Sequence, residues 1–82
     1  MKQQYKVDFL TVVQDGGVKS DCGDITFINY GISVVTINAT VNLLQNQSIT
    51  FSANENEIDK TIYYVKFSGI FNKLAVLRKI YT

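Results

Sequence analysis

Few side chains in this sequence could carry out chemistry. The chain has 82 residues, no histidine and a single cysteine, Cys22. Histidine is the most frequent general base and a common metal ligand, and without it the Cys22 thiol has no imidazole to activate it. The glycines around "QDGG" (14–17) lack the spacing of a phosphate-binding loop. We therefore expect that the protein is not an enzyme and that it binds neither a cofactor nor a small-molecule substrate.

Carboxylates are the remaining candidates for a metal site. They gather in two polar stretches and comprise Asp15, Asp21, Asp24, Glu55, Glu57 and Asp59. Loops rich in oxygen ligands can hold Ca²⁺, but neither stretch has the spacing of an EF-hand or the bidentate glutamate at its closing position. We expect both stretches to be hydrated loops without a metal ion. Whether the second stretch binds a cation stays open at this point.

The charge balance argues against a nucleic-acid partner. The sequence contains eight Lys and Arg and seven Asp and Glu, which gives a net charge of +1. Nucleic-acid binding depends on a basic excess, and the nearest approach to one is Lys73, Arg78 and Lys79 near the C-terminus. Three charges on one strand are more typical of a hydrated face than of a phosphate track. We expect no nucleic-acid partner.

No stretch of the sequence has the length and apolar character that membrane insertion requires. There is no run of about 18 apolar residues, and "KQQYKVDFL" after Met1 lacks the apolar segment of a secretion signal. One cysteine cannot form a disulfide within the chain. We expect a soluble protein that has no membrane partner and is made in a reducing cytoplasm.

Apolar and polar residues alternate through most of the chain, which is typical of β-strands. The alternating segments are 4–13, 25–30, 33–38, 41–44, 48–53, 61–67 and 73–81, while 18–24 is either a brief edge strand or a loop. Turn residues separate these segments every eight to twelve residues or so, and no segment has a helical period. The sequence predicts a single all-β domain over 1–82, an antiparallel β-sandwich or partly open barrel of about seven strands.

The aromatic residues are assigned by the same alternation. We expect four phenylalanines to lie in the core: Phe9, Phe27, Phe51 and Phe67. Tyr63 and Tyr64 are adjacent and must point to opposite faces, so one of them is exposed. Tyr30 and Tyr81 are further candidates for surface rings, which are frequent at protein interfaces.

Proline is absent from the whole chain. Edge strands of natural sheets often carry proline, because it prevents pairing with another chain. The absence of proline favours an edge strand that pairs with a partner.

The stretch from Ile25 to Phe51 has a distinctive order of strands and turns. A strand is followed by an "NYG" break, the strand "VTIN", a tight turn, leucines, a second turn and "QSITF". This order resembles small structural proteins of tailed bacteriophages, in which the second turn is often Pro-Gly; here it is Gln45-Asn46. The later "NENEID" and "LRKIY" resemble small virion proteins of phages that infect Bacteroidetes-like hosts. The resemblance covers about two-thirds of the chain.

The resemblance implies a virion protein, assembled in the host cytoplasm, that decorates the capsid, joins head and tail or accompanies a fibre. Its partners are then other virion proteins and copies of itself. The residues that we expect at such an interface are Glu55, Glu57, Asp59, Tyr63 and Tyr81. Two alternatives remain. Surface tyrosines and Asn/Gln-rich turns could bind carbohydrate or a cell surface, and an OB-like nucleic-acid binder is a third class.

Overall fold

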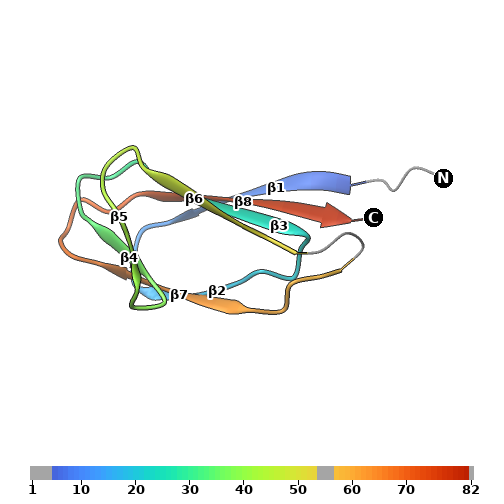
Figure 1. Cartoon of the computed structure of the whole chain (residues 1–82). Helices are drawn as coiled ribbons and strands as arrows, with labels where there is room; N and C mark the ends of the chain where they lie inside the picture. Colours follow the sequence, from blue (N-terminus) through green and yellow to red (C-terminus); the bar gives the residue numbers. More distant parts are fainter. Residues whose placement is uncertain (1–4, 54–56, 82) are drawn as a thin grey trace.

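The computed structural model of the chain describes residues 5–53 and 57–81 (Figure 1). All regular structure in this part is β-strand, as the alternation predicts. The strands are β1 (Tyr5–Val12), β2 (Gly16–Lys19), β3 (Asp24–Asn29), β4 (Val35–Ile37), β5 (Val41–Leu43), β6 (Ser48–Ser52), β7 (Ile62–Phe67) and β8 (Leu74–Tyr81). The described residues thus form eight strands rather than about seven. The additional strand is β2, an edge strand that begins at Gly16 and overlaps the start of 18–24, where either a brief edge strand or a loop was expected.

The first four strands pair with the last four in reverse order, as the two arms of one long hairpin would. β1 pairs with β8, β2 with β7, β3 with β6 and β4 with β5, all antiparallel. Further pairing of β3 with β8 and of β4 with β7 rolls this hairpin into two sheets, ordered β1-β8-β3-β6 and β2-β7-β4-β5. Eight strands wound in this way form a jelly roll, a double-sheet kind of β-sandwich.

The core lies between the two sheets and follows the alternation in each strand. Its buried apolar members are Val18, Cys22, Ile25, Phe27, Val35, Ile37, Leu43, Tyr63, Val65, Phe67, Leu74 and Val76. Phe27 is fully buried, and its ring meets the rings of Phe51 and Tyr63 edge-on, with centroids 6.1 and 5.4 Å away. Edge-on aromatic pairs at these distances stabilise a core beyond the area that they bury. The core placement of Phe27 and Phe67 is confirmed, and Phe51 packs against the core from a half-buried position.

The prediction for Phe9 is wrong. Its side chain is 72% exposed, although it stands in an alternating strand as Phe27 does. β1 is an edge strand, and its odd-numbered residues point to the outer face of the sheet, where no second layer covers them. Alternation identifies the two faces of a strand but not which face is covered.

The turns use the polar residues that the sequence offers. Asn38 and Ala39 both have positive φ, 52° and 59°, which is the backbone of the mirror-image turns that join adjacent antiparallel strands. Asn46 has a φ of 67° in the next turn, and asparagine tolerates this left-handed region better than most residues. The tight turn expected after "VTIN" and the second turn expected at Gln45-Asn46 are therefore confirmed.

Candidate interaction surfaces

Large apolar side chains are exposed where the loops meet at one end of the sandwich. In Figure 1 the β3–β4, β5–β6 and β7–β8 loops come together at the end opposite the labelled termini. The exposed apolar residues of these loops, with one from the β1–β2 connection, are Val13, Tyr30, Ile32, Leu44, Ile70 and Phe71. Ile70 is 85% exposed, Ile32 68% and Phe71 63%. We call this set the loop-end surface.

Asn29, at the end of β3, connects two of these loops from inside. Its side chain is fully buried and makes three hydrogen bonds. The amide nitrogen Nδ2 donates to the carbonyl oxygens of Ser33 at 2.8 Å and Leu43 at 2.9 Å, and Oδ1 accepts from the Gly31 N–H at 3.0 Å. A buried amide whose bonds are made in this way fixes the backbone around it.

Backbone hydrogen bonds join the β3–β4 loop to the β7–β8 loop. The Tyr30 and Gly31 N–H groups both donate to the Lys73 carbonyl, and the Ile32 and Ser33 N–H groups donate to the Phe71 carbonyl. This close approach requires a residue without a side chain, because a Cβ on Gly31 would lie 2.4 Å from the Phe71 oxygen. The loops that expose Ile32 and Phe71 are thus held by a hydrogen-bonded framework rather than left loose.

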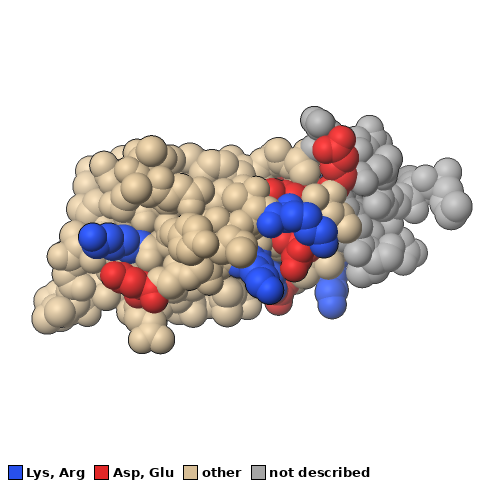
Figure 2. Space-filling model, turned by 90° about the horizontal axis from the view of Figure 1, so that it is seen from below, with Lys and Arg blue, Asp and Glu red and all other residues tan. Residues whose placement is uncertain are grey.

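The three loops carry little formal charge. Residues 30–34, 44–47 and 68–73 contain no Asp or Glu, and Lys73, next to β8, is their one Lys or Arg. Figure 2 shows one face of the molecule, on which side chains of both charges gather mainly toward the end of the described termini. A rigid and exposed apolar set is typical of a surface that meets another molecule. This surface could not be recognised from the sequence, because "YGIS" and "SGIF" look like ordinary breaks between strands.

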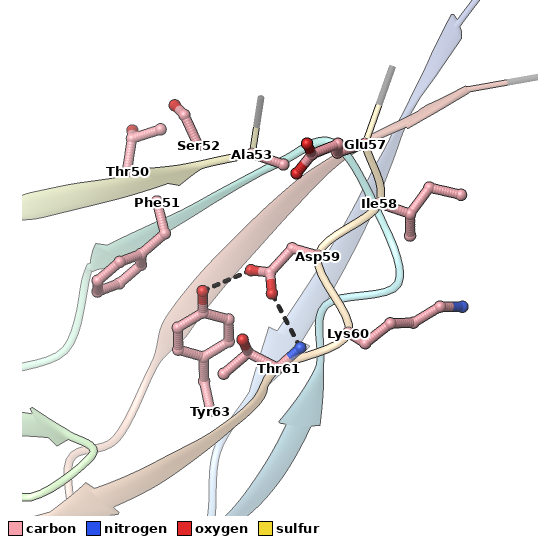
Figure 3. A pocket seen from close by; sticks show the side chains of 10 residues that line it. All are labelled: Thr50, Phe51, Ser52, Ala53, Glu57, Ile58, Asp59, Lys60, Thr61 and Tyr63. Atoms are coloured by element: carbon pink, nitrogen blue, oxygen red, sulfur yellow. Dashed lines mark hydrogen bonds between the residues drawn. The ribbon is translucent and has the colours of Figure 1, made fainter. Parts of the chain in front are cut away.

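The loop between β6 and β7, whose described part includes 57–61, is called the acidic loop. It borders an open pocket of about 660 Å³ at the end of the molecule opposite the loop-end surface (Figure 3). The residues that line it include Thr50, Ser52, Glu57, Asp59 and Thr61. The Asp59 carboxylate already has hydrogen-bond partners within the chain. It accepts from the Tyr63 hydroxyl at 2.6 Å and from the Thr61 N–H at 2.9 Å. Its own N–H donates to the Cys22 carbonyl at 2.8 Å.

The contact between Asp59 and Tyr63 shifts the pKa of both groups. Hydrogen bonds from Thr61 and then from Tyr63 lower the pKa of the Asp59 carboxyl. Burial, with the hydrogen bond to Asp59 as the second cause, raises the pKa of Tyr63 to about 12. At neutral pH this pair is a carboxylate that accepts from a neutral phenol, which is a charge-assisted hydrogen bond.

The residues expected at an interface are placed as follows. Glu55 lies outside the described residues, and Tyr81 is described only by its backbone, which pairs with Tyr5. Glu57 is exposed on the rim of the pocket. Asp59 and Tyr63 contact each other, but Tyr63 is only 5% exposed and belongs to the core, whereas Tyr64 is the exposed ring of the pair, at 64%.

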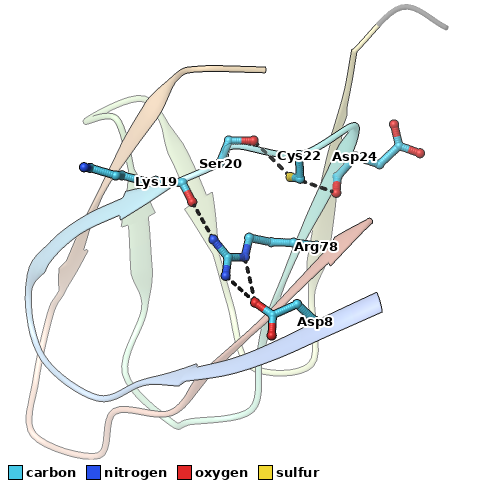
Figure 4. Close-up of polar contacts among 6 residues, drawn as sticks. All are labelled: Asp8, Lys19, Ser20, Cys22, Asp24 and Arg78. Atoms are coloured by element: carbon cyan, nitrogen blue, oxygen red, sulfur yellow. Dashed lines mark hydrogen bonds and ion pairs between the residues drawn. The ribbon is translucent and has the colours of Figure 1, made fainter. Parts of the chain in front are cut away.

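A second polar cluster lies between β1 and β2 (Figure 4). Arg78 donates from Nε and Nη2 to Asp8 and from Nη1 to the Lys19 carbonyl, so it ties one sheet to the other. These contacts, with the hydrogen bond first, lower the pKa of Asp8. The cluster makes Arg78 part of the framework of the sandwich rather than a group that is free for phosphate.

Cys22 lies close to this cluster but is poorly suited to act as a nucleophile. Its thiol is 3.2 Å from the Ser20 hydroxyl and donates to the Asp24 carbonyl at 3.2 Å. Burial raises the pKa of the thiol, so the reactive thiolate is disfavoured. Among residues 5–53 and 57–81, no three His, Cys, Asp or Glu side chains come together as metal ligands would.

Two further observations concern the class of the protein. The part of the chain that the structure describes contains no helix of the length and apolarity needed to cross a membrane. Comparisons with family models, with curated proteins and with solved structures found no match. The strand order and surfaces therefore define the class of the protein by themselves: a small jelly-roll β-sandwich with a rigid apolar loop end.

Replacing Tyr63 by phenylalanine tests the Asp59 contact through its pH dependence. At neutral pH we expect the free energy of unfolding to fall by about 1–2 kcal/mol, because Asp59 loses a donor. Between pH 10 and 12 the unfolded parent releases the Tyr63 proton while the folded parent keeps it, so the parent loses stability that the variant does not. Two pKa units correspond to about 3 kcal/mol over the whole window.

Denaturant unfolding at pH 7, 9 and 11 measures this effect. The gap between the parent and the Tyr63→Phe variant should shrink at pH 11. Tyr64→Phe is the matched control, because Tyr64 is exposed and its replacement should leave the gap near zero at each pH. A gap that stays constant up to pH 11 would contradict the assigned contact.

Proposed function

We propose that this protein is a non-enzymatic structural protein of a bacteriophage virion that acts by protein–protein assembly. The observation that supports this best is the loop-end surface. Its apolar side chains are exposed on a framework that Asn29 and Gly31 hold in place. Such a surface gains free energy when a partner covers it, at roughly 25 cal/mol per Å² of apolar area removed from water.

Two further points favour a virion component over other assemblies. The jelly roll is a fold of many viral capsid domains, although lectin domains share it and a fold alone does not decide function. The order of strands and turns from Ile25 to Phe51 also resembles small phage structural proteins. In this proposal the protein is assembled in the host cytoplasm, contacts other virion proteins and copies of itself, and decorates the capsid or belongs to a head–tail or fibre structure.

Incorporation into particles tests the proposal. A tagged copy is expressed in infected host cells, particles are purified by density gradient, and the tag is quantified. The triple variant Ile32→Ser, Ile70→Ser and Phe71→Ser should fold and yet be incorporated at least about tenfold less than the parent. Ile62→Ser with Tyr64→Ser is the matched control, because these side chains are also exposed but lie on the outer face of β7. Absence of the parent from purified particles would overturn the proposal.

Carbohydrate or cell-surface binding is the second candidate function, and the pocket beside the acidic loop favours it. Glu57 and Thr61 are among the residues that line an open hollow, and carboxylate and hydroxyl groups can hydrogen-bond sugar hydroxyls. A glycan array probed with the folded protein tests this. Binding that is lost in the Thr61→Val variant would support the pocket, whereas no bound glycan at high micromolar protein would remove this candidate.

A further inference from the structure

The free edge of β1 is the longest unpaired strand edge in the described part of the chain. β1 pairs with β8 over all eight of its residues, and no other described strand pairs with it. The competing edges are short: β2 has four residues, including two glycines, β5 has three and β6 has five. An edge strand offers a row of backbone donors and acceptors to another strand.

β1 lacks two of the usual devices that prevent such pairing. It contains no proline, and its register with β8 runs without a break from Tyr5 to Val12, so no bulge twists the edge away. Its outer face is apolar, with Tyr5 56%, Val7 46% and Phe9 72% exposed. The remaining device is charge, because Lys6 and Asp8 lie on the opposite face of the strand.

We propose that two copies of this protein pair through β1, antiparallel about a two-fold axis at Val7. The pairing deepens the proposed function, because it specifies how copies of the protein contact one another. The chemistry of the edge selects a second copy, since this strand is complementary to itself.

The register follows from parity and charge. Along one edge only every second residue presents its N–H and C=O groups, so the two residue numbers of each self-pair must sum to an even value. A sum of 14 places Lys6 opposite Asp8 of the second copy, twice. A sum of 12 places Lys6 against itself, and a sum of 16 places Asp8 against itself, which is unfavourable. A sum of 18 sets both charges against aliphatic side chains.

The outer face agrees with the same register. Tyr5 then lies opposite Phe9 of the second copy, and Val7 lies opposite itself, so aromatic and β-branched residues meet across the axis. Lys79 of β8 lies 4.4 Å from the centre of the Tyr5 ring and holds this ring on the outer face. Pairing would join two four-stranded sheets into one sheet and bring the exposed apolar rows of β1 in the two copies side by side.

Cysteine cross-linking of the isolated protein tests both the pairing and its register. Under mild oxidation Val7→Cys should form a disulfide-linked dimer, because the two Cβ atoms at the axis lie close to disulfide distance. Phe9→Cys should not form a disulfide. Position 9 lies opposite position 5 of the second copy, so the two introduced cysteines would be four residues apart along the paired strands, about 14 Å. The parent is the control, because its Cys22 is buried. Cross-linking at position 9 and not at position 7, or at neither, overturns the proposal.

Sedimentation of charge variants gives an independent readout. Val7→Glu should oppose a second glutamate across the axis, and should weaken self-association at least about tenfold. Tyr64→Glu, exposed on the other sheet, should leave self-association unchanged. Equal association of the two variants, or a strictly monomeric parent, overturns the dimer. Neither result bears on whether the protein is a virion component, because that proposal is tested by the content of purified particles.

Discussion

Replacing Asn29 by alanine is expected to lower the free energy of unfolding by about 3–5 kcal/mol. The side chain satisfies three buried backbone groups, the carbonyls of Ser33 and Leu43 and the N–H of Gly31. Each buried polar group that loses its partner costs about 1–3 kcal/mol. Because the core of so small a domain supplies only a few kcal/mol, this loss can unfold the protein outright.

Denaturant unfolding followed by circular dichroism measures the change. Asn42→Ala is the matched control, since Asn42 is exposed and its Oδ1 accepts one hydrogen bond, from the Thr36 hydroxyl at 2.9 Å. Its replacement should cost about 0.5 kcal/mol or less. Similar small losses in both variants would show that Asn29 is not the connection that the structure indicates.

Gly31→Ala is expected to destabilise the fold by about 3 kcal/mol, at the upper end of the range for overpacking. A Cβ at this position would lie 2.4 Å from the Phe71 carbonyl oxygen and 2.6 Å from the Lys73 nitrogen, and both are backbone atoms that cannot rotate away. The β3–β4 and β7–β8 loops would have to separate, so the variant should also lose incorporation into particles.

Gly16→Ala is the control, because a Cβ there meets no atom within 4 Å. Its stability should stay within about 0.5 kcal/mol of the parent. Thermal unfolding of the two variants side by side measures the difference. If Gly31→Ala unfolds at the temperature of Gly16→Ala, the contact between the loops is looser than described.

Much of the fold could be predicted from the sequence, because alternation reports directly on the two faces of a strand. Phe27 and Phe67 are buried, as the alternation of their strands predicts. The edge strands could not be predicted, because exposure at an edge depends on strand order, which residues distant in the sequence decide. Phe9 and Phe27 occupy equivalent local patterns and have opposite environments.

The surfaces were harder to predict than the fold. Tyr63 was correctly placed on the opposite face from Tyr64, but the hydrogen bond to Asp59 depends on how the 57–61 segment returns to β7. The loop-end surface arises only when three loops from distant parts of the sequence meet. Nothing local distinguishes Ile32 or Ile70 from an apolar residue that a neighbouring strand will cover.

The nested pairing of the strands makes the two ends of the molecule different. Tyr5 lies opposite Tyr81, so both ends of the described chain leave the sandwich at one place, while the loop-end surface lies at the other end (Figure 1). A polypeptide joined to either end would project away from a partner that docks on the loops. If the loops face a particle, cargo fused to this protein would be displayed on the outside.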